Sequence, residues 1–190
     1  MKKIVIGIIG CGTIGTFVAT QLAKRYADAV RVGYICDTDA TAAAQLKKRL
    51  RGRVRIVSQD TLIRESDMVV EAARVTVARD VLFKALRLHK KVLIMSVGAL
   101  LHITQKERDL LLKSTRGQLL LPSGAIGGLD VMQAARQVAI TSATITTSKP
   151  IAGLRGAPYF EQRGIDLATI KEPTVVFEGT AQQAIRFFPQ

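Results

Sequence analysis

The stretch IVIGIIGCGTIG, residues 4–15, decides the fold of this chain. Its first half is almost entirely β-branched and apolar, which predicts a strand buried on both faces, as in a parallel sheet. Its second half reads G-x-G-x-x-G, and apolar residues at helical spacing follow from residue 17 to residue 23. The sequence therefore predicts a strand, a tight glycine turn and a helix in direct succession.

The glycine turn has the spacing of a loop that binds the pyrophosphate of a dinucleotide. Gly10 permits the tight turn, Gly12 lets the backbone approach the phosphates, and Gly15 lets the helix pack closely on the strand. Backbone N–H groups at Thr13 and Ile14, at the positive end of the helix dipole, can then hold the phosphates.

An acidic residue stands where this motif requires one, at the end of the next strand. That strand is expected at residues 30–36 (VRVGYIC), and Asp37 follows it. A carboxylate there accepts hydrogen bonds from the adenosine ribose hydroxyls and repels a 2′-phosphate. We therefore predict NAD or NADP as cofactor, with NAD favoured; the basic residues 47–49 leave some room for a phosphate. The alternative is a tight β–α turn followed by an ordinary strand-end aspartate.

Length and composition narrow the class of protein. The 190 residues suffice for one domain and part of a second, and 48% hydrophobic residues suffice for a sizeable core. The basic residues that give the net charge of +13 lie on expected helix surfaces and turns. They are not accompanied by the stacked aromatic side chains of a nucleic-acid site. No apolar run is long enough to cross a membrane, so we expect a cytoplasmic protein with neither nucleic acid nor membrane as partner. Cys11 and Cys36 form no C-x-x-C motif, so neither metal nor disulfide is predicted.

Strands and helices alternate up to residue 121. We expect helices at residues 41–50, 75–88 and 104–115, and further strands at residues 53–57, 67–71, 91–95 and 118–121. Six strands with helices between them predict an α/β fold, a Rossmann-type doubly wound parallel sheet forming a dinucleotide-binding domain over residues 1–121.

In such a sheet the ligand lies at the carboxyl ends of the strands. The residues that follow the fourth and fifth expected strands there are small, which suits a close approach of the nicotinamide ribose. Small residues in ordinary β–α turns are the alternative. The additional cofactor-binding candidates are Ala72, Ala73, Ser96 and Gly98.

From residue 122 the pattern changes to that of a second, α+β domain for substrate binding and oligomerisation, covering residues 122–190. We expect a helix that reaches about Arg136, a strand at residues 138–147, a polar loop with Arg155 and Arg163, a strand at residues 174–177 and a helix at residues 180–187. No closing element follows, so we expect this domain to be incomplete, truncated at its C-terminus.

Several segments together resemble the L-aspartate dehydrogenase family. They are SVGAL from Ser96, LPSGAIGGLD from Leu121, TTSKP from Thr146, FEGTAQQAI from Phe177 and FFPQ at the end, besides GCGTIG and VVEAA. The resemblance implies oxidation of L-aspartate to iminoaspartate by NAD or NADP, then hydrolysis to oxaloacetate and ammonia. It also implies a homodimer when the chain is complete and a place in pyridine nucleotide biosynthesis.

The resemblance also assigns residues. Ala125 matches the family's cofactor-contacting alanine in the PSGAI segment. The family's next cofactor contact, an asparagine, and its catalytic histidine would follow Gln190, so we expect residues 1–190 alone to bind dinucleotide but to turn over L-aspartate negligibly. Catalytic candidates within the chain are His102 and Lys149; a cation before Pro150 could pair with a substrate carboxylate. Capping or solvated surface roles are the alternatives for both.

Two other functions stay open from the sequence. An oxidoreductase of the homoserine dehydrogenase or dihydrodipicolinate reductase type would share the first domain but not PSGAIGGLD. A dinucleotide-binding module without catalysis would share the fold and lack the chemical residues. Reduction of the cofactor that depends on L-aspartate would favour the enzyme, and binding without turnover would favour the module.

Overall fold

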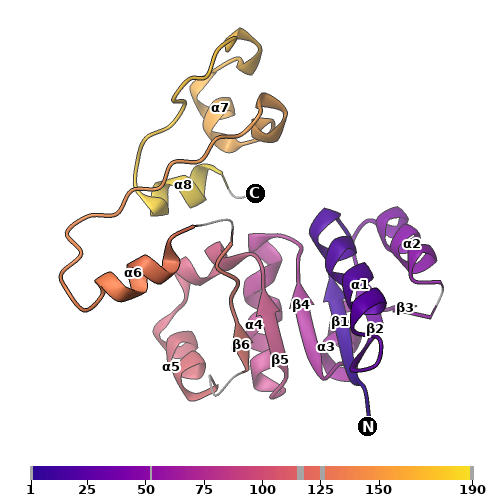
Figure 1. The fold of residues 1–190 in the computed structure, drawn as a ribbon. Coiled ribbons are helices and arrows are strands. Elements are labelled where there is room, and N and C mark those ends of the chain that lie inside the picture. The colour runs from indigo at the N-terminus through magenta and orange to yellow at the C-terminus, as the bar shows by residue number, and fades with distance from the viewer. Residues whose placement is uncertain (1, 52, 115–117, 125–126, 189–190) are drawn as a thin grey trace. The chain divides into compact units, whose positions relative to one another are not determined.

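The computed structural model describes residues 2–51, 53–114, 118–124 and 127–188 (Figure 1). The chain divides into two compact units, Met1–Pro122 and Ser123–Gln190. In the described residues, no helix combines the length and apolar character that a bilayer crossing needs.

The first unit is built on a six-stranded parallel sheet with the order β3-β2-β1-β4-β5-β6. The order reverses between β1 and β4, which is the switch point of a doubly wound sheet, so the predicted Rossmann-type fold is confirmed. Strands β3 and β6 are only two residues long and thus clearly shorter than predicted, and β4 and β5 are each one residue shorter than predicted. The strands are β1 (Ile4–Ile9), β2 (Val30–Cys36), β3 (Arg55–Ile56), β4 (Met68–Glu71), β5 (Lys91–Ile94) and β6 (Leu119–Leu120).

Helices cover the two faces of the sheet in two groups (Figure 1). Helices α1 and α2 pack on Ile6, Ile8 and Ile35 on one face, and α3 and α4 pack around Val69 and Val92 on the other. The central strands are therefore apolar on both sides, as the run at residues 4–9 predicts. The helices are α1 (Thr13–Arg25), α2 (Ala40–Arg49), α3 (Gln59–Glu65), α4 (Val75–Arg87), the 3₁₀ helix η1 (Val97–His102) and α5 (Gln105–Ser114).

Helix α3 and the short η1 were not predicted from the sequence. A signal for α3 is present, because the Ser58 hydroxyl accepts a hydrogen bond from the Thr61 N–H (3.3 Å) at the start of the helix. Leu62 and Ile63 then bury one side of this two-turn helix in the core. Two turns are too short to show the apolar periodicity on which the prediction relied.

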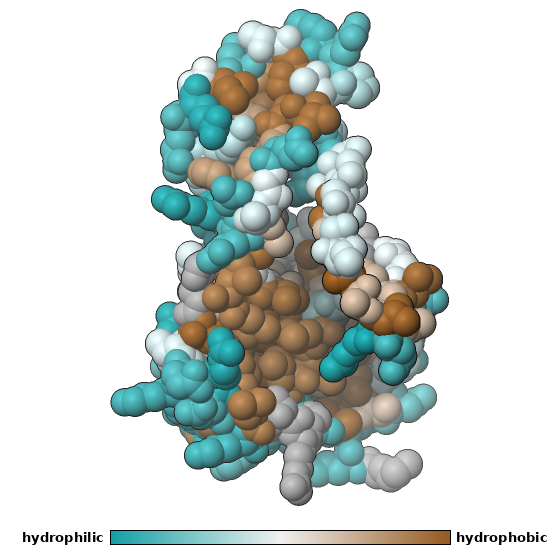
Figure 2. Space-filling view, turned by 90° about the vertical axis from the view of Figure 1, so that its left-hand side faces the viewer, coloured by the Kyte–Doolittle hydropathy of each residue, from teal (hydrophilic) through white to brown (hydrophobic). Residues whose placement is uncertain are grey.

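The outer edge of the sheet at β6 is apolar. β6 pairs with β5 alone among the described strands, and Leu120 and Leu121 are 42% and 45% exposed. Figure 2, which looks at the side that lies on the left in Figure 1, shows apolar residues gathered in a broad area of the surface. An unpaired strand beside exposed apolar side chains is a surface that other chains can cover.

The second unit contains helices but, within its described residues, no strand. The strands predicted at residues 138–147 and 174–177 are therefore wrong, and the predicted polar loop contains η2 and α7. β-branched composition favours a strand only where a neighbouring strand supplies ladder hydrogen bonds and side-chain contacts, and none is described here. The elements are α6 (Leu129–Ala135), η2 (Ile151–Leu154), α7 (Pro158–Arg163), η3 (Leu167–Thr169) and α8 (Ala181–Phe187).

A cluster of aromatic rings forms the core of the second unit. The ring of Tyr159 lies 5.3–5.5 Å, between ring centroids, from four phenylalanine rings. The guanidinium of Arg163 lies 4.9 Å from the Tyr159 ring centroid. Such pairs bury large areas and add about 0.5–1.5 kcal/mol each beyond that burial. The cluster therefore fastens α7 to the C-terminal helix through Phe160, Phe177, Phe187 and Phe188.

Candidate functional site

Two glycines of the β1–α1 turn are required by the packing of the chain itself. Gly10 has φ +95°, and a side chain there would run into the backbone carbonyl of Ala72. A side chain on Gly15 would run into the carbonyl of Gly10. The turn therefore admits the close contact between helix α1 and strand β1 only with glycine at both positions.

Gly12 differs, because its backbone conformation does not need glycine and nothing crowds it. It has φ −70°, and a Cβ built on it would have no atom within 4 Å beyond its immediate neighbours in the chain. Gly12 is the N-cap of α1, no side chain caps this helix, and its first turn contains no acidic residue. The free N–H groups at this terminus face open space, and they stand at the positive end of the helix dipole. Both features favour the binding of an anion. The residues present therefore fit the pyrophosphate of a dinucleotide.

The carboxylate of Asp37 ties the glycine turn to the end of β2. Its Oδ2 accepts a hydrogen bond from the Cys11 N–H (2.6 Å), and its Oδ1 accepts one from the Asp39 N–H (2.8 Å). The Gly10 N–H donates to the Cys36 carbonyl (2.9 Å) in the same place. Each carboxylate oxygen keeps a further lone pair. Asp37 is thus fixed beside the turn and still able to accept hydrogen bonds from a ligand.

The two cysteines beside Asp37 are free thiols. Burial, followed by the negative charges of Asp37 and Cys36, raises the pKa of Cys11 to about 12. Burial and Asp37 also raise the pKa of Cys36. Since the thiolate is the reactive form, both side chains are poor nucleophiles near neutral pH. They act as small apolar residues in the wall of the site.

A pocket of about 540 Å³ opens from the glycine turn and runs between α1 and α2. Hydroxyl groups of α1 and the cation of Arg49 lie along it. The outer side of the turn is therefore reached from solvent through a partly polar groove. Its lining residues are Cys11, Gly12, Thr13, Thr16, Phe17, Thr20, Ala42, Gln45, Leu46 and Arg49.

The structure brings the small residues at the ends of β4 and β5 to the same edge of the sheet as the glycine turn. The Ala72 N–H donates to the Ile9 carbonyl (2.8 Å), so the segment after β4 lies directly against the turn. Ser96 and Gly98 follow β5, at the start of η1. Thr13 and Ile14 lie in the first turn of α1, as predicted from the motif.

One residue at this edge was not predicted as a site residue from the sequence. Glu71 ends β4 fully buried, and its carboxylate accepts hydrogen bonds from the segments after both β4 and β5. The signal was the placement of a charged residue at the end of the apolar strand VVE, where a carboxylate needs buried donors.

The two catalytic candidates lie in different units of the chain. His102 is the last residue of η1. Lys149 is exposed in an irregular segment just before Pro150, the N-cap of η2, and not at the end of a strand as predicted. Ala125 lies outside the described residues. The positions of His102 and Lys149 assign a catalytic role to neither residue.

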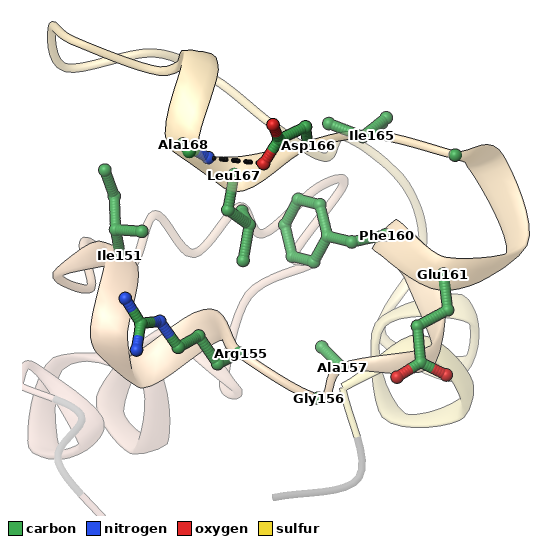
Figure 3. Close-up of a pocket in the computed structure, with 11 residues that line it drawn as sticks. Ile151, Arg155, Gly156, Ala157, Phe160, Glu161, Ile165, Asp166, Leu167 and Ala168 are labelled. Carbon is green, nitrogen blue, oxygen red and sulfur yellow. Dashed lines mark hydrogen bonds between the residues drawn. The ribbon is translucent and has the colours of Figure 1, made fainter.

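The second unit has a pocket of its own, of about 500 Å³ (Figure 3). Its wall is mostly apolar, with the ring of Phe160 and the side chain of Leu167 directed inward, and Arg155 lies at its rim. The Asp166 carboxylate already has a partner within the fold, because its Oδ1 accepts a hydrogen bond from the Ala168 N–H (2.8 Å). The pocket is therefore a mostly apolar recess whose lining also includes the charged residues Arg155, Glu161 and Asp166.

The strand order, the open N-terminus of α1 and Asp37 define a dinucleotide-binding domain of the Rossmann type. A family profile described as "Homoserine dehydrogenase, NAD binding domain" matches residues 10–119, and one described as "Aspartate dehydrogenase, C-terminal" matches residues 130–190. The chain is 40% identical to the L-aspartate dehydrogenase of Methanocella arvoryzae, and the alignment covers 97% of this chain and 68% of that protein. The chain belongs to the L-aspartate dehydrogenase family.

Other relatives agree with this assignment. The L-aspartate dehydrogenase of Methanosarcina mazei is 37% identical, covering 97% of this chain and 68% of the relative. L-aspartate dehydrogenase 3 of Bordetella bronchiseptica is 33% identical, covering 99% and 68%. The resemblance expected from the sequence motifs is confirmed, and with it NAD or NADP as the cofactor.

Solved structures show the fold at greater distance. Myo-inositol dehydrogenase from Lactobacillus casei in complex with NAD(H) and myo-inositol has a TM-score of 0.56 at 14% identity, covering 84% of this chain and 52% of that one. GenD2 from gentamicin A biosynthesis in complex with NAD has a TM-score of 0.52 at 18% identity, covering 64% and 34%. These likenesses concern the fold alone.

Proposed function

We propose that this protein is an NAD-dependent L-aspartate dehydrogenase, which oxidises L-aspartate to iminoaspartate. Water then hydrolyses the imine to oxaloacetate and ammonia. The observation that carries the proposal is the uncapped N-terminus of α1 at Gly12 beside the fixed carboxylate of Asp37. Membership in the L-aspartate dehydrogenase family supports the choice of substrate.

In this proposal the residues at the carboxyl edge of the sheet hold the cofactor. Asp37 accepts hydrogen bonds from the ribose hydroxyls of the adenosine half, and bound NAD supplies the hydride acceptor. The backbone N–H groups of the turn hold the pyrophosphate. Small side chains leave room for the nicotinamide half, and Ala125 is proposed to touch it through its backbone. The residues proposed for these contacts are Gly10, Gly12, Thr13, Ile14, Gly15, Asp37, Ala72, Ala73, Ser96, Gly98 and Ala125.

For the substrate, we propose that Lys149 pairs with a carboxylate of L-aspartate. Its exposed ammonium group on the segment before Pro150 has the charge this contact needs. Oxidation of the amine also requires a group that takes up a proton from the nitrogen. His102 is the proposed candidate for that role among the residues of this chain.

We further propose a cytoplasmic homodimer whose partners are small molecules, with its product entering pyridine nucleotide biosynthesis. The two free thiols suit a reducing compartment. The exposed apolar edge at β6 is a surface that a second copy could cover. The basic residues 47–49 are exposed on α2, which fits a solvated helix surface without nucleic acid. Sedimentation equilibrium measures the assembly, and a monomer at all concentrations would contradict the dimer.

The test of the proposed reaction follows the hydrogen on Cα of the substrate. L-Aspartate deuterated at Cα is incubated with NAD and the protein. We expect deuterium at C4 of the reduced nicotinamide, together with oxaloacetate. D-Aspartate serves as the control and should transfer none. A protein that binds NAD but shows no L-aspartate-dependent reduction would instead be a dinucleotide-binding module.

A further inference from the structure

Glu71 carries a carboxylate into the interior of the first unit. Its relative exposure is 0%, and it is the only charged residue among the buried residues that the structure describes. Burying a carboxylate without partners costs several kcal/mol, so the surrounding donors are essential to the fold at this point. Glu71 is also the last residue of β4, next to the switch point of the sheet.

The donors to this carboxylate come from two different segments. Oε1 accepts a hydrogen bond from the Ala73 N–H (2.8 Å) and another from the Ser96 hydroxyl (2.9 Å). Oε2 accepts one from the Ser96 N–H (3.1 Å). One side chain therefore fixes the segment after β4 to the segment after β5.

The same side chain acts on the glycine turn through a short chain of contacts. Ala72 and Ala73 follow Glu71 directly, and the Cα of Gly10 faces the carbonyl of Ala72 so closely that no side chain would fit. The Ala72 N–H also donates to the Ile9 carbonyl (2.8 Å). Glu71 thus joins the segments after β4 and β5, and the first of these segments contacts the end of β1.

We infer that Glu71 is a positioning residue for the nicotinamide half of the cofactor. The inference rests on the proposed function of this edge of the sheet. The segments it joins, at residues 72–73 and 96–98, consist mostly of alanine, serine and glycine, whose short side chains make few contacts that could hold a defined position. Hydride transfer depends on placement within about 1 Å, so loosening these segments should act on the nicotinamide end first. In the proposed function the adenosine end is held separately, by Asp37 beside the glycine turn.

The chemistry of the contact requires a carboxylate at position 71. The N–H groups of Ala73 and Ser96 can only donate, so both oxygens of Glu71 must accept. Glutamine has one accepting oxygen and would turn an N–H donor toward a backbone N–H. Glu71→Gln should therefore release one of the two segments while changing the size of the side chain little.

Asp67 provides a matched control at the other end of the same strand. It precedes β4, and its Oδ2 accepts a hydrogen bond from the Val5 N–H (2.8 Å). Asp67→Asn makes the same chemical change as Glu71→Gln, but its remaining amide oxygen can still accept the single hydrogen bond from the Val5 N–H, so it tests the loss of the charge alone. It lies at the amino edge of the sheet, away from the proposed cofactor site.

The experiment compares the dissociation constants of NADH and ADP-ribose, which lacks nicotinamide, in the full chain. We expect Glu71→Gln to weaken NADH binding about tenfold more than ADP-ribose binding, with a shift in the fluorescence of bound NADH. Asp67→Asn should leave the ratio of the two constants unchanged. An unchanged ratio in Glu71→Gln would overturn the inference, since a merely structural role would affect both ligands alike.

Two further outcomes of this experiment can be told apart from a failure of the inference about Glu71 alone. If the unmodified chain binds neither NADH nor ADP-ribose, the proposed function of this edge fails, and the inference about Glu71 fails with it. If Glu71→Gln does not fold, Glu71→Asp decides instead, because it keeps both accepting oxygens on a shorter side chain. We expect a smaller loss in the same ratio for Glu71→Asp, and a ratio equal to that of the unmodified chain would overturn the inference.

Discussion

Replacement of Gly12 by valine is expected to weaken NAD binding by about a hundredfold or more. The new side chain would occupy the open space at the N-terminus of α1, where the proposed pyrophosphate contacts lie. Losing two hydrogen bonds to a charged group costs about 1.5–3 kcal/mol each, which corresponds to that factor or a larger one. Titration of NAD by calorimetry measures the change.

The fold should survive this substitution. Gly12 has φ −70° and ψ −161°, an extended conformation that valine adopts readily, and beyond the immediate chain neighbours no atom lies within 4 Å of a Cβ built there. Gly15→Val is the contrasting variant, because its side chain would meet the Gly10 carbonyl and should unfold the unit. If Gly12→Val binds NAD as the unmodified chain does, the pyrophosphate does not lie at this turn.

Asp37→Ser is expected to shift the preference between NAD and NADP by roughly ten- to a hundredfold toward NADP. The substitution removes both the acceptor for the ribose hydroxyls and the negative charge that repels a 2′-phosphate. Because Asp37 also holds the N–H groups of Cys11 and Asp39, we expect the affinity for NAD to fall as well. The ratio of the two dissociation constants is therefore the quantity to measure.

Asp39→Ser is the matched control for this prediction. Asp39 caps α2 by accepting hydrogen bonds from the N–H groups of Thr41 (2.8 Å) and Ala42 (3.2 Å). Serine can still cap a helix, so the stability should change by less than about 1 kcal/mol and the NAD to NADP ratio should stay the same. An unchanged ratio in Asp37→Ser would show that Asp37 does not read the ribose.

The fold of the first unit was predictable because its signals are local and repeated. Strand β1, the glycine turn and α1 follow one another within residues 4–25, and each carries its own pattern of apolar and small residues. Helix α3 escaped prediction because two turns show too little periodicity. The strands β3 and β6 are shorter than predicted because, among the described strands, each pairs with a neighbour on one side only.

The second unit was predicted less well for the opposite reason. The residues at 138–147 have the composition of a strand but no described partner with which to pair. Helix α7 carried a usable signal, with Pro158 at its first position and Gly164 at φ +62° after its end. What joins α7 to α8 is the ring cluster around Tyr159, which no local pattern reveals.

The candidate site was likewise predicted from the sequence only in part. The glycines and Asp37 were found from their spacing, which the chemistry of a dinucleotide fixes. The contacts that hold the site together, from Asp37 to Cys11 and from Glu71 to Ser96, join residues more than twenty positions apart. Such contacts depend on which strands become neighbours, so the role of Glu71 emerged only from the structure.

The most direct test of the account maps where NAD binds. Backbone amide chemical shifts of the chain are recorded with and without NAD. We predict the largest changes at residues 11–14, 72–73 and 96–98, at the carboxyl edge of the sheet, and little change at Asp67 on the amino edge. Changes centred on Asp67 or on the pocket at residues 151–168, with the glycine turn unaffected, would contradict the account.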